Sequence, residues 1–339
     1  MKAVLCKEYG SPEQLVLEDV AALTPEKGQV VISVKACGVN FPDTLMIQGK
    51  YQFKPPMPFS PGNEVSGIIK EVGESVGGVG GVGGVGGVDR IKVGDRVIAF
   101  TGWGGFAEEV ITDATNLIPM PNDMDFTTAA AFTLVYGTSY HALKDRAQIQ
   151  PGETLLVLGA AGGVGLAAIE IAKVMGARVI AAASTDEKLA VCKQHGADEI
   201  INYATEDLKE RVKVLTLGNG VDVVYDPVGG SYSEAALRST AWKGRFLVVG
   251  FATGDIPRIP LNLTLLKGCS IVGVFWGNFV AREPRHNQEN LQELLSWFAT
   301  GKIKPLISAT YQLKDAAHAL NDMMNRNIKG KVVLLTDQI

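Results

Sequence analysis

The feature that most constrains this chain is a glycine-rich turn between an apolar strand and a helix. Residues 155–166 read LLVLGAAGGVGL, so a short apolar run leads into small residues that open a helical pattern. Ala160, Gly162 and Gly165 stand at the three small positions of a G-x-G-x-x-G pattern, with alanine replacing the first glycine. Small residues there let the backbone approach a pyrophosphate, and they leave the amides of the helix N-terminus for its oxygens. The pattern predicts a dinucleotide site that includes Ala160, Gly162, Gly163, Val164 and Gly165.

Strand and helix patterns alternate around this turn. The apolar runs typical of strands occupy residues 154–158, 178–183, 199–201, 221–225 and 244–249. The helical patterns between them occupy residues 163–175, 186–195 and 232–240. Such alternation indicates a parallel, doubly wound α/β sheet with helices on both faces. We predict a dinucleotide-binding domain at residues 125–269, with Asp125 as the N-cap of a helix over 127–143.

The N-terminal part of the chain, residues 1–124, is instead rich in short strands. Strand patterns occur at residues 30–36, 65–72 and 96–100. The short connections between them indicate an antiparallel, barrel-like domain. The tail of the chain is mixed, with helical patterns at 288–300 and 314–326 before a strand at 331–335. We predict that this tail, residues 270–339, returns to complete the first domain.

Composition narrows the classes of protein. The chain of 339 residues is 46% hydrophobic and 20% charged, which is typical of a globular protein of about two domains. A formal net charge of −4 argues against a nucleic-acid-binding surface. No apolar run approaches the ~18 residues of a membrane span, and the first residues have no apolar signal core. Four scattered cysteines without a C-x-x-C pair indicate reduced thiols, so we expect a cytoplasmic protein without a metal cluster.

The end of the second strand in the doubly wound pattern bears on which dinucleotide is bound. A site for NAD places Asp or Glu there, about 20 residues after the glycines, to bind the ribose hydroxyls. This chain has the neutral residues Ala183, Ser184 and Thr185 at that point, followed by Lys188. Ser184 can donate a hydrogen bond to a 2′-phosphate, and Lys188 can pair with it as a point charge. We therefore predict NADPH, although the ordinary interpretation of Lys188 is a solvated helix residue.

Five further motifs occur in order along nearly the whole chain. They are ACGVNFPD at 36–43, PGNEVSG at 61–67, KVGDRV at 92–97, DPVGG at 226–230 and GKVV at 330–333. Together with the glycine turn, they resemble the medium-chain dehydrogenase/reductase superfamily. The resemblance implies a Rossmann doubly wound parallel sheet plus a GroES-like, β-rich catalytic domain that the C-terminal tail completes.

Two asparagines set this chain apart from the zinc-dependent members of that superfamily. Asn40 stands where those enzymes have a ligand cysteine, and Asn63 stands where they have a ligand histidine. Neutral amides are poor zinc ligands compared with thiolate and imidazole. The structural zinc lobe expected after the KVGDRV turn is also missing, and the four histidines lack ligand spacing. The chain is thus similar to the zinc-independent quinone oxidoreductase branch, and we predict no metal.

The resemblance implies hydride transfer from NADPH to a quinone or to the β-carbon of an activated alkene. Oxidation of a simple alcohol is poorly supported without a Lewis acid, whereas a polarised acceptor requires donors for its developing oxyanion and then a proton. The catalytic candidates are Asn40, Asp43 and Tyr51. Asn40 could donate to the nicotinamide carboxamide or to the substrate oxygen, Asp43 could orient it, and Tyr51 could be a wall or a proton donor. A structural role in a turn or in packing is the alternative for Asn40 and Tyr51.

Further cofactor contacts are carried over by position from the resemblance. Tyr203 matches a tyrosine that flanks the 2′-phosphate, and Asn327 lies near a C-terminal position that reaches the cofactor. The strand ends that line the nicotinamide correspond to Gly250, Phe251, Phe275, Trp276 and Gly277. Core or dimer packing is the alternative for Phe275 and Trp276. The strand there often pairs across a dimer in the family, so the resemblance implies a homodimer.

Two other functions stay open from the sequence. An enoyl-thioester reductase, acting on acryloyl- or crotonyl-type acyl-CoA, could use Arg282, Arg285 and Lys54 to neutralise a CoA phosphate, although solvated arginines are commoner. A non-catalytic, NADPH-binding dimer is the second alternative. For the enzymes, the expected partner is a small molecule (a quinone, enone or enoyl thioester), with neither a nucleic acid nor a membrane.

A second glycine-rich segment has a different character from the dinucleotide turn. Residues 76–88 read VGGVGGVGGVGGV, in which four GGV triplets follow Val76. Without residues 77–88, the loop would be close to the length that the family uses between these strands. Because lengthening a loop costs little free energy, we predict a repeat expansion in a surface turn outside the active site.

Overall fold

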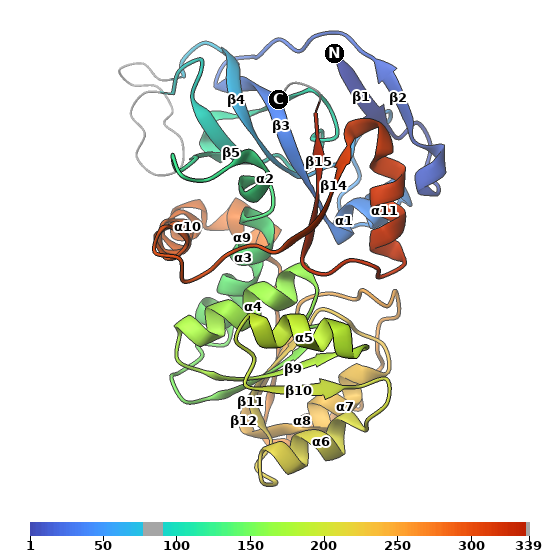
Figure 1. Ribbon diagram of the computed structural model, residues 1–339, viewed down its shortest axis with the longest axis vertical. Coiled ribbons are helices and arrows are strands. Elements are labelled where there is room, and N and C mark those ends of the chain that lie inside the picture. The colour runs from blue at the N-terminus through green and yellow to red at the C-terminus, as the bar shows by residue number, and fades with distance from the viewer. Residues whose placement is uncertain (77–90, 337–339) are drawn as a thin grey trace. The chain divides into compact units, whose positions relative to one another are not determined.

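The structure, a computed structural model, describes residues 1–76 and 91–336 of the chain (Figure 1). The chain divides into two compact units. Unit 1 comprises Met1–Leu134 and Ile307–Ile339, and unit 2 is the continuous segment Val135–Leu306. The C-terminal strands therefore complete the β-rich unit, as the resemblance implied.

Unit 2 is built around a six-stranded parallel sheet in the order β10-β9-β8-β11-β12-β13. Its strands are β8 (Thr154–Leu158), β9 (Arg178–Ala183), β10 (Glu199–Asn202), β11 (Val221–Asp226), β12 (Thr240–Val248) and β13 (Ser270–Gly273). The crossover helices are α4 (Gly163–Val174), α5 (Asp186–Gln194), α6 (Leu208–Leu215) and α7 (Tyr232–Arg238). Figure 1 shows α4 and α5 on one face of the sheet and α6 and α7 on the other. The predicted doubly wound fold is confirmed, and both faces are covered because the strands are apolar throughout.

The strand order of this sheet reverses between β8 and β11, which pair directly. In open α/β sheets the ligand lies outside the carboxyl ends of the strands at such a switch point. The glycine turn follows β8 directly and opens α4, so the topology places it at the ligand-binding edge of the sheet. The rest of the unit after β12 consists of β13 and the helices α8 (Asn262–Lys267), α9 (Trp276–Arg282) and α10 (Pro284–Ala299).

Unit 1 has a main sheet in the order β14-β15-β3-β4-β5-β7, with β6 paired to β3 and a separate β1–β2 pair. Its strands are β1 (Lys2–Leu5), β2 (Val16–Asp19), β3 (Gln29–Val39), β4 (Glu64–Val72), β5 (Arg96–Phe100), β6 (Glu109–Asp113), β7 (Leu117–Pro119), β14 (Ile307–Gln312) and β15 (Lys331–Leu335). Its α-helices include α1 (Phe41–Ile47), α2 (Phe126–Ala129) and α11 (Ala316–Met324). Alternate side chains of β3 (Val30, Ile32 and Val34) share one buried core with Leu320 of α11 and Val332 of β15. Because every second side chain of a strand points to the same face, this alternation lets β3 cover the core with one face.

Two stretches differ from the sequence expectation. The predicted helix over 127–143 is divided into α2, α3 (Thr133–Tyr140) and a π-helical segment, His141–Arg146. Its predicted N-cap is confirmed, because the Asp125 carboxylate accepts from the Thr128 backbone amide at 2.8 Å. Residues 270–306, which the sequence analysis grouped with the returning tail, lie in unit 2, because β13 extends the parallel sheet next to β12.

Two further points concern the described residues. Within 1–76 and 91–336, no helix is long and apolar enough to cross a membrane. The GGV repeats at 77–88 lie outside the described residues, so the surface-turn hypothesis stays a prediction.

Candidate functional site

A buried polar cluster lies in unit 1 at the point where three neighbouring strands begin or end. Asn40 directly follows β3, Glu64 is the first residue of β4, and Lys331 is the first residue of β15. Because β3 pairs with both β4 and β15, the register brings these ends together: Gly38 lies opposite Glu64, and Val39 lies opposite Val332. Strand pairing alone therefore gathers polar residues from three distant parts of the chain.

The side-chain amide of Asn40 is the centre of this cluster. Its Nδ2 atom donates to Asn63 Oδ1 at 3.0 Å, to Glu64 Oε2 at 3.3 Å and to the Gly38 carbonyl at 3.3 Å. Its Oδ1 atom accepts a hydrogen bond from the ammonium group of Lys331. Both ends of the amide are thus engaged within the cluster. The geometry favours a positioning role for Asn40 over direct donation to a substrate.

Lys331 and Glu64 form an ion pair inside the protein. Lys331 Nζ lies 3.4 Å from Glu64 Oε2 and donates to the Val39 carbonyl at 3.2 Å. The second carboxylate oxygen of Glu64 accepts from the Leu134 amide at 2.7 Å. Asn63 and Lys331 are each 3% exposed, and Glu64 is fully buried. A pair of buried charges persists only where its remaining donors and acceptors are satisfied, as they are here, and removing one partner is strongly destabilising.

Asp43 holds the backbone on both sides of this cluster. One oxygen of its carboxylate accepts from the Asn40 amide at 2.8 Å, and the other accepts from the Gly62 amide at 3.2 Å. The side chain thereby ties the start of α1 to the segment before β4, which carries Asn63. Burial raises the pKa of Asp43 to about 7, against the opposing effect of these two amide donors. Gly62 has a φ of +90°, and a side chain there would meet Phe106 and Cys37, so this turn requires glycine.

Tyr51 lies beside this clamp. Its ring is half-buried and packs against the core of unit 1. Burial, together with the negative charge of Asp43, raises the pKa of the Tyr51 hydroxyl above its ordinary value. The hydroxyl therefore stays protonated at neutral pH, as a hydrogen-bond donor must.

The glycine turn of unit 2 has the geometry of a phosphate cradle. Gly159 has a φ of +56°, and a Cβ on Gly165 would lie 2.6 Å from the Ala160 carbonyl oxygen. A Cβ on Gly162 would meet nothing closer than the Gly159 carbonyl at 3.4 Å. Gly162 is the N-cap of α4, and no side chain of the described residues caps this helix. The first amides of α4, beginning at Gly163 and Val164, are therefore available to an anion, which fits a dinucleotide.

The residues predicted to face the 2′-phosphate follow two adjacent strands. Ser184 comes directly after β9, and Tyr203 comes directly after β10, where its amide donates to the Ala183 carbonyl at 3.1 Å. The Tyr203 ring lies 4.3 Å from the ring of Tyr232. Lys188 is in the first turn of α5, which Thr185 caps. The fold thus brings Ser184 and Tyr203 together at the carboxyl ends of two neighbouring parallel strands.

The other predicted cofactor residues have different environments. Gly250 and Phe251 follow β12, and the Gly250 amide donates to the Asp226 carbonyl at 3.3 Å. Trp276 at the start of α9 is only 4% exposed, and its indole donates to Asn287 at 3.1 Å. Its position in the core matches the packing alternative. Phe275 beside it is 53% exposed.

Gly277 and Asn327 complete the predicted set. Gly277 lies inside α9. Asn327 is exposed in unit 1 and donates to Asp322 at 3.2 Å, so its side chain already has a partner near its own helix.

Sequence reasoning left three members of the polar cluster out of the predicted site: Asn63, Glu64 and Lys331. The available signal was a charged residue at the start of an apolar strand, since Lys331 precedes VVLL and Glu64 precedes VSGII. Neither lysine nor glutamate is buried at such a position without a partner. The partner itself depends on strand register, which the sequence pattern does not specify.

The donor set of this cluster does not fit a zinc ion. Two amides and one carboxylate replace the thiolate and imidazole ligands that zinc prefers, and the ammonium of Lys331 already contacts Asn40 and Glu64. Among the residues that the structure describes, no three His, Cys, Asp or Glu side chains come together as metal ligands.

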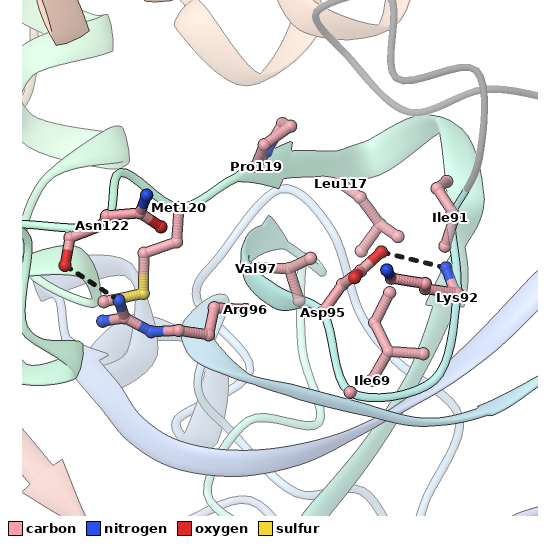
Figure 2. Close-up of a pocket in the computed structure, with 11 residues that line it drawn as sticks. Ile69, Ile91, Lys92, Asp95, Arg96, Val97, Leu117, Pro119, Met120 and Asn122 are labelled. Carbon is pink, nitrogen blue, oxygen red and sulfur yellow. Dashed lines mark hydrogen bonds between the residues drawn. The ribbon is translucent and has the colours of Figure 1, made fainter.

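Unit 1 also contains a cavity of about 420 Å³, and none of the polar-cluster residues lines it (Figure 2). It is bounded by β5, β7 and the turn before β5, and includes Ile69, Val97 and Leu117. Figure 2 shows Asp95 turned back to the amide of Lys92, and Arg96 directed to the Asn122 carbonyl. The side chains of Asp95 and Arg96 are thus engaged in local structure, and no lining residue belongs to the polar cluster.

Comparisons with known proteins cover nearly the whole chain. Residues 26–122 match the family model described as the alcohol dehydrogenase GroES-like domain, and residues 163–300 match the one described as zinc-binding dehydrogenase. The chain is 42% identical to a quinone oxidoreductase-like protein 2 homolog of Nematostella vectensis, over 99% of this chain and 89% of that protein.

Two solved structures show the same fold. The quinone oxidoreductase of Pseudomonas syringae has a TM-score of 0.89 and 34% identity, covering 98% of this chain and 99% of that chain. The Escherichia coli quinone oxidoreductase complexed with NADPH has a TM-score of 0.88 and 30% identity, covering 99% of this chain and all of that chain.

Proposed function

Because the chain belongs to the quinone oxidoreductase branch of the medium-chain dehydrogenase/reductase superfamily, we propose that it transfers a hydride from NADPH to a quinone or a related activated alkene or carbonyl. The observation that carries the proposal is the polar cluster of unit 1. There the amides of Asn40 and Asn63 contact each other, and the ammonium of Lys331 contacts Asn40. By the family resemblance, the two asparagines stand where zinc-dependent relatives have metal ligands. Hydrogen-bond donors of this kind suit the reduction of an already polarised acceptor.

The chain's own residues support the reaction by binding and orientation. NADPH, when bound, supplies the hydride. The uncapped amides of α4 would bind its pyrophosphate, and Gly162 leaves space for the phosphate to approach the backbone. In unit 1, Asp43 holds the segments that carry Asn40 and Asn63, while Tyr51 keeps its proton because burial raises its pKa. We propose Asn40 and Asp43 as positioning residues and Tyr51 as a donor or wall of the substrate site.

The acceptor is tested by following NADPH oxidation with three substrates: 1,4-naphthoquinone, an α,β-unsaturated aldehyde and crotonyl-CoA. The proposal expects turnover with the quinone or the aldehyde. Faster turnover with crotonyl-CoA would favour the enoyl-thioester reductase instead. Tight NADPH binding without turnover of any of the three would favour the non-catalytic alternative and overturn the proposed function.

We propose NADPH over NADH because the end of β9 is neutral and Ser184, Lys188 and Tyr203 lie on the elements that follow β9 and β10. Lys188→Ala and Tyr203→Phe should each weaken NADPH binding and leave NADH binding unchanged, because only NADPH has the 2′-phosphate. Lys209→Ala, which removes an exposed lysine from α6, is the matched control. Equal affinity of the parent protein for both dinucleotides would contradict this assignment.

We also propose a homodimer that forms through the edge of unit 2. The edge strand β13 has no neighbour on its outer side among the described residues, and Ile271 within it is exposed. Large apolar side chains are exposed on the elements next to it: Trp242, Ile256, Leu261, Leu265 and Leu266. An unpaired edge with apolar surroundings is typical of a surface that a second copy covers.

The dimer is tested by light scattering after size-exclusion chromatography. The variant Leu265→Asp with Leu266→Asp should be monomeric, because two charges would be buried in the interface. Leu217→Asp, at a still more exposed leucine in the turn after α6, should leave the dimer intact. A monomeric parent protein at micromolar concentration would overturn the proposal.

A further inference from the structure

We propose that Asn63 supplies the hydrogen-bond donor for the acceptor oxygen, and that Lys331 sets the direction of that donor through Asn40. This inference rests on the proposed reductase function and deepens it. It concerns two residues outside the set of catalytic candidates that sequence reasoning identified.

The direction of the Asn40 amide is determined by Lys331. An ammonium group has three donors and no acceptor, so the Asn40 atom that faces it must be the carbonyl oxygen. The amide nitrogen then faces Glu64 Oε2 at 3.3 Å, which can only accept as a carboxylate. Both neighbours require the same orientation, so the usual ambiguity between amide oxygen and nitrogen does not arise.

The orientation of Asn40 in turn determines that of Asn63. The Asn40 nitrogen can only donate, so the Asn63 atom 3.0 Å away must be the carbonyl oxygen. The nitrogen of Asn63, on the other arm of the same planar amide, therefore points away from the cluster. The contact with Lys331 thus fixes the orientation of both amides, and the N–H group of Asn63 faces outward from the cluster.

The side-chain nitrogen of Asn63 donates no hydrogen bond within residues 1–76 and 91–336. The residue as a whole is only 3% exposed, but this nitrogen is not one of the fully enclosed polar atoms that lack a partner, so a small ligand can reach it. The backbone around it is held firmly: the Gly62 amide binds Asp43, and the Asn63 carbonyl accepts from the Thr101 amide at 2.9 Å. A donor that is held in place, is accessible and has no partner in the protein is the feature expected of a group that binds a ligand oxygen.

The chemistry of the acceptor explains the donor. When the hydride leaves NADPH, the acceptor gains one hydrogen and two electrons, and NADP⁺ remains. Negative charge then develops on the carbonyl oxygen of a quinone, enone or thioester, and a proton from water completes the reduction. An amide N–H about 2.7–3.1 Å from that oxygen stabilises the charge as it forms. Asn63 is thus assigned as a catalytic residue, and Lys331 and Asn40 as positioning residues.

The first test compares Asn63→Ala and Asn63→Asp with the parent protein, and uses Asn122→Ala, at an exposed loop asparagine, as the control. We expect kcat with 1,4-naphthoquinone to fall by about 10²-fold in Asn63→Ala, and further in Asn63→Asp, because a carboxylate repels the oxyanion. The dissociation constant of NADPH, measured by fluorescence, should change less than twofold. Unchanged kcat in Asn63→Ala, in a parent that turns over, would overturn this inference and leave the proposed function intact.

A spectroscopic measurement separates donation from a merely structural role. In the protein loaded with NADP⁺, bound 1,4-naphthoquinone cannot be reduced, and its carbonyl stretch should shift to lower frequency because of the hydrogen bond. The shift should disappear in Asn63→Ala and persist in Asn122→Ala. A shift that persists in Asn63→Ala would overturn the assignment without reference to turnover.

The relay is tested by a double-mutant cycle with Lys331→Met. Because Lys331 acts through Asn63, the change should lower kcat in the parent but add little in the Asn63→Ala background. Additive losses would overturn the relay. If Lys331→Met unfolds because Glu64 loses its partner, Lys331→Arg decides. Arginine, like lysine, has only donors, so the Lys331→Arg variant should keep the frequency shift of the bound quinone carbonyl. Loss of that shift in a folded Lys331→Arg variant would contradict the relay.

Discussion

The side-chain nitrogen of Asn40 donates a hydrogen bond to the side-chain oxygen of Asn63 across 3.0 Å. The two residues follow and precede different strands, β3 and β4, and Asp43 holds the backbone on both sides of the contact. The contact joins the two segments that carry metal ligands in zinc-dependent relatives. The two amides are hydrogen-bonded to each other and lie beside the buried ammonium of Lys331. Each amide therefore has a defined orientation.

Two glycines of the dinucleotide turn should respond differently to the same substitution. Gly162→Ala fits the protein alone, because its Cβ would approach nothing closer than 3.4 Å, but it would occupy the space of a phosphate. We expect its free energy of unfolding to change by less than about 1 kcal/mol while NADPH affinity is lost. Gly165→Ala would place Cβ 2.6 Å from the Ala160 carbonyl, so it should destabilise the protein by about 1–3 kcal/mol.

Urea unfolding and NADPH fluorescence titration of both variants check this contrast. Equal NADPH affinity in Gly162→Ala and the parent would show that the turn does not hold a pyrophosphate.

Asp43 should make stability fall as pH rises. Its pKa is about 7 in the folded protein, above the ~3.9 of an unfolded chain, so the folded state holds the extra proton between these values. The free energy of unfolding should decline across that window, by up to about 4 kcal/mol from this group, and the decline should level off as the pH rises past the folded pKa of about 7. In Asp43→Asn the decline should be smaller.

Urea unfolding at several pH values between 4.5 and 8 measures the slope. Asp123→Asn, at an exposed aspartate, is the control and should keep the parent slope. An Asp43→Asn variant with the same slope as the parent would argue against a raised pKa at this carboxyl.

The four cysteines should be unreactive in the folded protein. Cys6, Cys37, Cys192 and Cys269 are free and buried, and burial raises the pKa of each thiol, that of Cys192 to about 12. Because the thiolate is the reactive form, a disulfide reagent should modify all four only after unfolding. Titration with and without guanidinium measures this, and one rapidly modified thiol per native chain would contradict it.

The GGV repeats should be dispensable. Deletion of residues 77–88 should leave NADPH affinity and turnover unchanged and alter the free energy of unfolding by less than about 1 kcal/mol, since loop closure depends only on the logarithm of loop length. A folded deletion variant without turnover would show that the repeats contribute to the active site. Circular dichroism provides the check that the variant is folded.

Much of the fold follows from local patterns. The run LLVL before the glycines and the helical pattern after them specify a strand, a turn and a helix within twelve residues, so the strand–turn–helix unit at the start of the parallel sheet could be predicted from the sequence. The helix predicted over 127–143 was less accurate, because its interruption after Ala129 and its π-helical end leave no simple mark in the pattern.

The sequence by itself determined the doubly wound fold and the glycine turn, because both depend on residue types at local spacings. That Asn40 and Asn63 stand in place of zinc ligands is what the family resemblance implies. Only the tertiary structure decided what these asparagines contact. Lys331 is 291 residues from Asn40, and it reaches that side chain because β15 pairs with β3 in one register. A shift of that register by one residue would turn Lys331 to the opposite face of the sheet. The direction of the donors at the site therefore depends on strand pairing, which no local pattern encodes.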